Sequence, residues 1–181
     1  MQSNSLEGKL VSQSKTVMTE MIMPNDTNPL GNLMGGNLMR WMDIAAAICA
    51  NRHAEAFCVT VSVDHISFYK SIKLGQVITV ESTITRAFNT SMEVYVQVFA
   101  SDSRKKEGEL ANHAFFSFVA LDEHTLKPME VPQIKPANAE EEQLFNSAMA
   151  RREMRLLLSG RLEAKNAKVL REILEGKRVF F

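Results

Sequence analysis

The feature that most constrains the fold is a long apolar segment, NLMRWMDIAAAICANRHA, in the first third of the chain. It contains no proline or glycine for about five turns, and leucine, methionine and alanine favour helix. We therefore predict a helix over residues 37–53. Apolar residues lie on nearly all sides of it, which is typical of a helix enclosed by other structure rather than lying on a surface. The rest of the domain must supply the surface that encloses it.

Four segments after this helix predict β-strands. They are CVTVSVD (58–64), VITVESTITR (77–86), SMEVYVQVF (91–99) and the more uniformly apolar ELANHAFFSFVALD (109–122). The first three alternate apolar and polar residues with the period of two that gives a strand one buried face. Residues 16–23 predict an earlier strand. Short turns between strands favour antiparallel neighbours, so the predicted class is α+β, an antiparallel sheet wrapped around a long central helix.

Composition limits the possible functions. Of the 181 residues, 21 are Lys or Arg and 21 are Asp or Glu, so an anionic ligand such as nucleic acid would need a local basic patch. Cys49 and Cys58, each in an apolar run, predict buried free thiols rather than a disulfide or a metal site. No apolar run is long enough for a membrane span, and the polar N-terminus lacks the apolar core of a signal peptide. We expect a cytoplasmic protein with neither nucleic acid nor membrane as a partner.

The chain divides by composition into three parts. Residues 1–13 are a polar N-terminal segment, and residues 14–132 form the folded domain. Residues 133–181 are a linker and a C-terminal helical extension, since prolines around the start of this part are followed by a charged, helix-like sequence. We expect Gly160 to separate two helices. The second helix carries an apolar stripe, formed by Leu162, Val169, Leu170, Ile173 and Leu174.

Asp43 is the most informative single residue. It lies in LMRWMDIAAAI, where a buried carboxylate is costly unless it is compensated or faces a site. Residues three and four positions away on the same helix face are small, apart from Met39 and Arg40, so a ligand could approach the carboxylate. A structural alternative is an ion pair between Asp43 and Arg40, worth about a few tenths of a kcal/mol on an exposed helix. Residue types alone leave both alternatives open.

Two glycines open the predicted helix. Gly35 and Gly36 allow the backbone to approach a ligand closely, and a helix N-terminus presents unpaired N–H groups at the positive end of its dipole. Such groups can polarise a carbonyl oxygen, although a glycine pair often only makes a turn. Asn32 and Asn37, which lie nearby, could orient a water molecule or cap the helix.

Other residues carry weaker signals. His53 ends the predicted helix, where a cation suits the dipole, so we interpret it as structural. The other histidines show no metal-ligand spacing, and the sequence contains no G-x-S-x-G, P-loop, Rossmann or zinc motif, so no metal site is expected. Met34, Met39 and Met42 cluster near the glycines, where they either fill the core or line an adaptable apolar pocket.

Three motifs in a fixed order resemble a known family. GNLMGGNLMRWMDIAAAICANRH, then VTVSVD, then TSMEV closely resemble the hotdog-fold acyl-CoA thioesterases of the YciA and brain acyl-CoA hydrolase type. The resemblance covers residues 16–132, about two thirds of the chain, and does not extend to the tail. It implies a hotdog fold, in which an antiparallel sheet wraps a long helix, and hydrolysis of acyl-CoA to free fatty acid and CoA without a cofactor.

The resemblance also implies residue roles. The essential Asp of the family corresponds to Asp43, acting as general base or nucleophile, its loop Asn to Asn32, and its carbonyl-polarising amide to Gly36. The substrate-binding positions that it implies are Gly35, Thr60, Arg86, Thr90 and Ser91. Lys70 and the basic run 104–106 are weaker candidates for contact with the CoA phosphates.

The resemblance also implies how copies of the chain assemble. Members of the family pair two hotdogs so that their sheets run on, and often join three pairs into a hexamer. The active site forms at the pair interface, with Asn32 and Asp43 from opposite subunits. A non-enzymatic acyl-CoA-binding or structural hotdog oligomer is the alternative function. A hydratase is disfavoured, because it would require a histidine beside Asp43 on the helix.

Overall fold

The computed structural model describes residues 7–105 and 107–176. The chain forms two compact units, Met1–Lys135 and Pro136–Phe181, and each is considered by itself. Within the described ranges, no helix is both long and apolar enough to cross a membrane.

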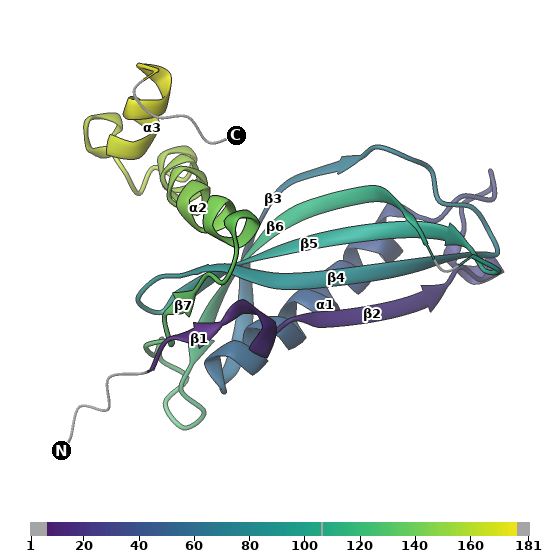
Figure 1. The fold of residues 1–181 in the computed structure, drawn as a ribbon, viewed down its shortest axis with the longest axis horizontal. Coiled ribbons are helices and arrows are strands. Elements are labelled where there is room, and N and C mark those ends of the chain that lie inside the picture. The colour runs from purple at the N-terminus through teal and green to yellow at the C-terminus, as the bar shows by residue number, and fades with distance from the viewer. Residues whose placement is uncertain (1–6, 106, 177–181) are drawn as a thin grey trace. The chain divides into compact units, whose positions relative to one another are not determined.

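The first unit is a five-stranded antiparallel sheet around one helix. The strand order is β2-β4-β5-β6-β3, and helix α1 contacts all five strands. Figure 1 shows α1 running behind the long strands. The expected α+β class and its central helix are confirmed. The elements are β2 (Thr16–Met21), α1 (Gly35–Ala54), β3 (Phe57–Phe68), β4 (Gln76–Ala87), β5 (Ser91–Asp102) and β6 (Glu109–Leu121).

The core lies between α1 and the inner face of the sheet. Val94, Val96 and Val98 of β5 are fully buried, as expected from their alternation. They face the small and apolar side of α1, which includes Met42 and Ala46, both also fully buried. Cys49 is a buried free thiol as expected, whereas Cys58 is free but only half-buried.

Strand β3 departs from the expectation of one buried face. Val59, Val61 and Val63 are 44%, 56% and 36% exposed. The reason is topological: among the residues that the structure describes, β3 is the outermost strand of the sheet and pairs with β6 alone. A register shift between Thr60 and Ser62 also places an extra residue in the strand at this point. The alternating pattern predicted the strand correctly, but the described residues of the first unit do not cover the valine row.

The N-terminal segment contains structure that the sequence did not predict. Strand β1 (Lys9–Leu10) pairs in parallel with β7 (Ile134–Lys135). Val11, in the 3-10 helix Val11–Gln13, is only 5% exposed. Residues expected to be a polar lead-in and the start of a linker therefore close one end of the first unit. Strands of two residues are too short for a period of two to indicate them.

The second unit contains two helices, α2 (Ala139–Leu158) and α3 (Lys168–Leu174), with a 3-10 helix, Ala164–Asn166, between them. Gly160 follows α2 with a φ of +70°, a conformation that glycine adopts at little cost after a helix, so the predicted separation is confirmed. Asn138 caps α2 by accepting a hydrogen bond from the Glu141 amide. Within the predicted apolar stripe, Leu174 is 86% exposed.

Candidate active site

The Asp43 carboxylate is anchored by strand β3. Asp43 is half-buried on α1, and its Oδ1 accepts a hydrogen bond of 2.7 Å from the Thr60 hydroxyl. The register shift that follows Thr60 is a β-bulge, a feature that re-aims side chains. In the described part of the chain no ion pair joins Asp43 to Arg40, so the structural alternative for Asp43 does not hold. Oδ2 of Asp43 has no hydrogen-bond donor among the described residues and is available to a ligand.

The N-terminus of α1 lacks a side-chain cap. The helix begins at Gly35, two residues earlier than expected, and its N-cap residue is Met34. Neither Asn32 nor Asn37 caps it. The first amides of a helix have no partner within the helix, so the Gly36 N–H is a candidate donor. A Cβ built at Gly36 would meet nothing within 4 Å, which leaves open space for a ligand beside this amide.

An open pocket of about 420 Å³ lies beside this helix start. Its lining residues come from the loop before α1, the start of α1 and the segment that follows β3. They are Asn28, Asn32, Leu33, Gly35, Leu38, Phe68, Lys70, Ser71 and Ile72. The structure thus brings the predicted residues Asn32 and Gly35 together. Asp43 does not line the pocket, and eight residues of helix place it about 12 Å from Gly35.

Asn28 is a pocket residue that the sequence reasoning missed. Its Oδ1 accepts hydrogen bonds from the backbone amides of Leu30 and Asn32, at 3.0 and 3.2 Å. The side-chain oxygen therefore shapes the loop, while the Nδ2 donor has no acceptor among the residues that the structure describes. The available signal was Asn28 followed by proline, a pair that favours turn initiation.

The remaining predicted substrate-binding residues lie at the opposite end of the sheet. Arg86 is near the end of β4, with its guanidinium 5.8 Å from the ring centre of Phe88. Thr90 and Ser91 form the β4–β5 turn, and Ser91 pairs in register with Val119, which itself pairs with Val59 near the start of β3. Phe68, at the pocket, ends the same strand. Nine residue-to-residue steps lead from Val59 to Phe68, about 30 Å along β3.

The basic candidates for phosphate binding are engaged elsewhere. The Lys70 ammonium is 2.5 Å from Glu109 Oε2. Arg104 pairs with Asp102, and this pairing holds the pKa of the Asp102 carboxyl well below its usual range. Both pairs are solvent-exposed and therefore weak, so a phosphate could displace either of them. Lys106, the last residue of the basic run, lies outside the described residues.

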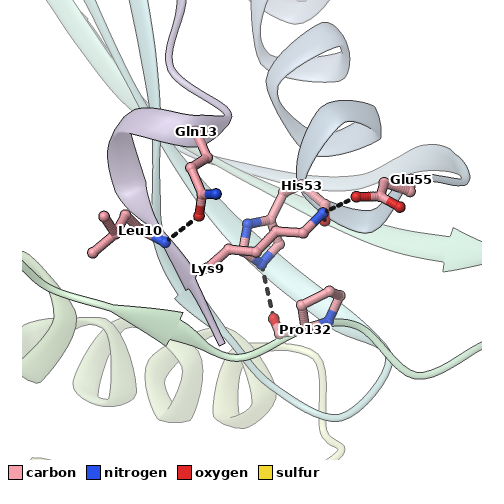
Figure 2. Close-up of polar contacts among 6 residues, drawn as sticks. All are labelled: Lys9, Leu10, Gln13, His53, Glu55 and Pro132. Carbon is pink, nitrogen blue, oxygen red and sulfur yellow. Dashed lines mark hydrogen bonds and ion pairs between the residues drawn. The ribbon is translucent and has the colours of Figure 1, made fainter. Parts of the chain in front are cut away.

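His53 is structural, as expected. Its side chain is fully buried, and Nε2 lies 2.8 Å from the Pro132 carbonyl oxygen. A carbonyl oxygen only accepts, so Nε2 donates its proton to Pro132. Burial lowers the pKa of His53, and the nearby Lys9 lowers it further. Figure 2 shows Lys9 reaching past the ring to Glu55, with Nζ 2.9 Å from the His53 carbonyl, so Lys9 supplies the cation at the helix end.

The two cysteines do not supply a nucleophile. Burial raises the pKa of Cys49 to about 12 and that of Cys58 to about 11. The thiolate is the reactive form of cysteine, so both groups are protonated and unreactive at neutral pH. The half-buried carboxylate of Asp43 is therefore the stronger candidate for a catalytic group.

Comparison with known proteins decides the family. The family model described as the thioesterase superfamily matches residues 30–107. A Bacillus subtilis protein named as an uncharacterized acyl-CoA thioester hydrolase, YkhA, is 39% identical over 80% of this chain and 84% of its own length. The chain belongs to the thioesterase superfamily. Mouse acyl-coenzyme A thioesterase 11 is 38% identical to this superfamily member. The match covers 77% of the present chain but only 23% of the mouse protein.

Solved structures confirm the hotdog fold. An acyl-CoA hydrolase from Bacillus cereus superposes with a TM-score of 0.81 at 32% identity, covering 91% of this chain and 98% of that one. A hexameric acyl-CoA thioesterase superposes with a TM-score of 0.81 at 37% identity, covering 84% of this chain and 97% of that one. An acyl-CoA hydrolase from Staphylococcus aureus, solved with butyryl-CoA and CoA, superposes with a TM-score of 0.78 at 35% identity. The match covers 84% of this chain and 94% of that one.

Three further structures of the Staphylococcus aureus hydrolase are of single-residue variants. Alanine replaces its Asp43, its Thr60 and its Asn28, one in each variant. The present superfamily member has the same residue types, Asp43, Thr60 and Asn28, at the same three numbers. Two of these residues, Asp43 and Thr60, form the hydrogen-bonded pair described above, and the third, Asn28, lines the pocket. Residues of the same three types were replaced in the Staphylococcus aureus protein.

Proposed function

We propose that this chain is an acyl-CoA thioesterase that hydrolyses acyl-CoA to free fatty acid and CoA without a cofactor. The observation that carries the proposal is the Asp43 carboxylate. It is half-buried on the central helix, held at 2.7 Å by the Thr60 hydroxyl, and has its second oxygen open. The names of the relatives as acyl-CoA thioester hydrolases support the same reaction.

In the proposed reaction, the thioester carbonyl oxygen lies against the Gly36 amide. This N–H at the positive end of the helix dipole stabilises the negative charge that develops on the oxygen. Asp43 either removes a proton from water, which attacks the carbonyl carbon, or attacks directly to form a mixed anhydride that water then hydrolyses. The C–S bond breaks and CoA leaves as the thiol, which takes its proton from the Asp43 carboxyl in the first route and from water in the second. Thr60 is a positioning residue, since its hydrogen bond fixes Oδ1 and directs Oδ2 outward.

The pocket amides supply the other polar groups. We retain the proposal that Asn32 positions the water or the carboxylate. Asn28 is added to it because Asn28 also lines the pocket and because the Staphylococcus aureus hydrolase was changed at its own Asn28. Gly35, Thr60, Arg86, Thr90 and Ser91 remain proposed contacts for the substrate, with the last three directed to its CoA portion.

The active site is proposed to form between two copies of the chain. Gly35, which lines the pocket together with Asn28 and Asn32, lies about 12 Å along α1 from Asp43, and this separation supports a site in which Asp43 and the pocket belong to different copies. Strand β3 has one open edge and an exposed valine row, which makes it a template for pairing with another strand. A twofold antiparallel pairing through β3 would bring the Phe68 end of one copy toward Thr60 and Asp43 of the other.

The relatives also support proposals for the oligomeric state and the cellular location of this chain. Two solved thioesterases that superpose on this chain are hexameric, and we propose that three pairs join into a hexamer here as well. A mouse relative at 37% identity is named a cytosolic acyl coenzyme A thioester hydrolase. A cytoplasmic location is proposed for this chain on that basis.

The proposal is tested by release of free thiol from a panel of acyl-CoAs with chains of two to sixteen carbons. Wild-type protein should release CoA, and Asp43→Asn, which is nearly isosteric, should fold normally and lose roughly a hundredfold or more in turnover. Arg40→Gln is the matched control on the same helix face and should stay within about threefold of wild type. Binding of acyl-CoA without hydrolysis by the wild type would favour the non-enzymatic alternative.

A further inference from the structure

The pocket beside the start of α1 has two kinds of wall. One is apolar and consists of Leu33, Leu38, Phe68 and Ile72. The other carries the amides of Asn28 and Asn32. A cavity with a mainly apolar lining and a few polar groups at one side is suited to a ligand with a hydrocarbon part and a polar end. An acyl chain joined to a thioester is a ligand of this kind.

Phe68 forms the adjustable part of the apolar wall. Leu38 and Ile72 are each only 3% exposed and belong to the core, whereas Phe68 is 57% exposed at the end of β3. Its ring can therefore be changed without opening a cavity inside the domain. Lys70, which also lines the pocket, extends its ammonium away to Glu109 on β6 at 2.5 Å. The pocket wall beside Phe68 is therefore not occupied by a free charge.

Gly35 determines where the Phe68 ring lies. A Cβ at Gly35 would be 3.1 and 3.4 Å from two carbons of that ring, closer than normal carbon–carbon contact distances. The backbone of Gly35 does not have a positive φ, so its conformation does not require glycine. Space for the ring is what glycine provides at this position. Gly36, one residue later, has open space instead.

We propose that this pocket binds the acyl chain of the substrate and that the Phe68 ring, seated against Gly35, limits the length of chain that fits. The inference rests on the proposed thioesterase function and deepens it by assigning the residue that sets its substrate range: acyl chains whose length is limited by the Phe68 ring. Removing the ring lengthens the pocket, and a larger ring shortens it. One methylene in an apolar pocket changes discrimination by about tenfold or more, so the chain-length profile reads out the pocket directly.

The test compares kcat/KM for butyryl-CoA and dodecanoyl-CoA in four variants. Phe68→Ala should raise the ratio of dodecanoyl to butyryl activity by about tenfold or more, and Phe68→Trp should lower it. Gly35→Ala should also lower the ratio, because the added methyl pushes the ring toward the pocket. Phe57→Ala is the matched control, since Phe57 is an exposed phenylalanine at the other end of the same strand. It should leave the ratio within about twofold of wild type.

Circular dichroism and light scattering on each variant establish that fold and assembly are unchanged. A uniform change at every chain length in Phe68→Ala, with no shift of the ratio, would overturn the inference. Failure of the thioesterase proposal looks different, because wild type would then release no thiol from any acyl-CoA. In that case, calorimetric binding of non-hydrolysable acyl-CoA thioethers of the same two lengths provides the ratio, and it must shift in Phe68→Ala for the inference to stand.

Discussion

Strands β3 and β5 carry the same kind of valine row and have opposite environments. Val94, Val96 and Val98 of β5 are fully buried, while Val59, Val61 and Val63 of β3 are 36–56% exposed. The difference lies in the neighbours. Strand β5 has β4 and β6 on its two sides, whereas β3 is outermost and, in the described part of the chain, has β6 as its single neighbouring strand.

An alternating pattern of apolar and polar residues therefore predicts that one face of a strand is buried. It does not predict whether the same chain or a second copy covers that face. An exposed, apolar edge strand is a hazard in a monomer, because its free backbone groups pair readily with other chains. The valine row on β3 therefore fits a strand that a second copy covers. The row on β5 stabilises the single chain, and the row on β3 is proposed to stabilise the pair.

The largest effect is expected in the core. Val96→Asp places an unpaired carboxylate in a fully buried position on β5, which costs about 3–5 kcal/mol. This is a large share of the roughly 5–15 kcal/mol that stabilises a typical domain. The variant should be unfolded or nearly so by circular dichroism and urea titration. A stable Val96→Asp variant would break the assignment of β5 to the core.

The same substitution on β3 should act on assembly alone. Val61→Asp should leave the free energy of unfolding of one copy within about 0.5 kcal/mol and weaken pairing roughly a hundredfold or more, because it places charge in a desolvated interface. Light scattering should report single copies. Val17→Asp on β2, the opposite edge strand, is the matched control, since Val17 is 55% exposed. Equal loss of pairing in both variants would contradict the assignment of the interface to β3.

Acid should act on the subunit core rather than on the interface. His53 has a lowered pKa in the folded state, so the unfolded chain takes up its proton first as pH falls. Stability is therefore retained above about pH 6.5 and lost below it, by at most about 1.4 kcal/mol per pH unit. Lys9 and Glu55 lie beside this histidine, and the pairing with Lys9 lowers the pKa of Glu55, so the Glu55 carboxylate stays charged between about pH 5.5 and 7.5. Urea titrations across that range should show the slope in wild type and a flatter one in His53→Asn.

The smallest effect is expected from the second unit. Truncation after Pro136 removes α2 and α3 but none of the elements of the sheet. The first unit should fold, pair and retain activity, while assembly beyond the pair weakens. Helices with so narrow an apolar stripe are marginal alone and need another surface to stabilise them. An oligomer of unchanged size after truncation would remove the second unit from assembly.

The sequence predicted the fold to the extent that local patterns determine it. The apolar helix and the four following strands were identified, because their periods extend over many residues. The helix start at Gly35 was missed by two residues, since glycine has a low helix propensity. The pairing of β1 with β7 could not be predicted, because each strand has only two residues and their partners are far apart in the chain.

Site residues could be predicted where a residue type is unusual for its sequence surroundings. They could not be predicted where their role depends on contact with residues far away in the sequence. Asp43 could be identified because a carboxylate in an apolar helix is conspicuous. The anchoring hydrogen bond from Thr60 and the contact of Phe68 with Gly35 join residues that are 17 and 33 positions apart, and no local pattern encodes them. Asn28 was overlooked because its pairing with Pro29 indicates a turn before it indicates a site.

The central claim is that the active site is shared between two copies, and subunit mixing tests it most directly. One protein carries Asp43→Asn and the other carries Asn28→Ala with Asn32→Ala, and each alone should have little activity. After exchange, confirmed by native mass spectrometry, each mixed pair contains one site with every group intact, so thiol release should recover to a substantial fraction of wild type. No recovery in a confirmed mixture would contradict the account, because sites within single chains stay damaged however the copies are paired.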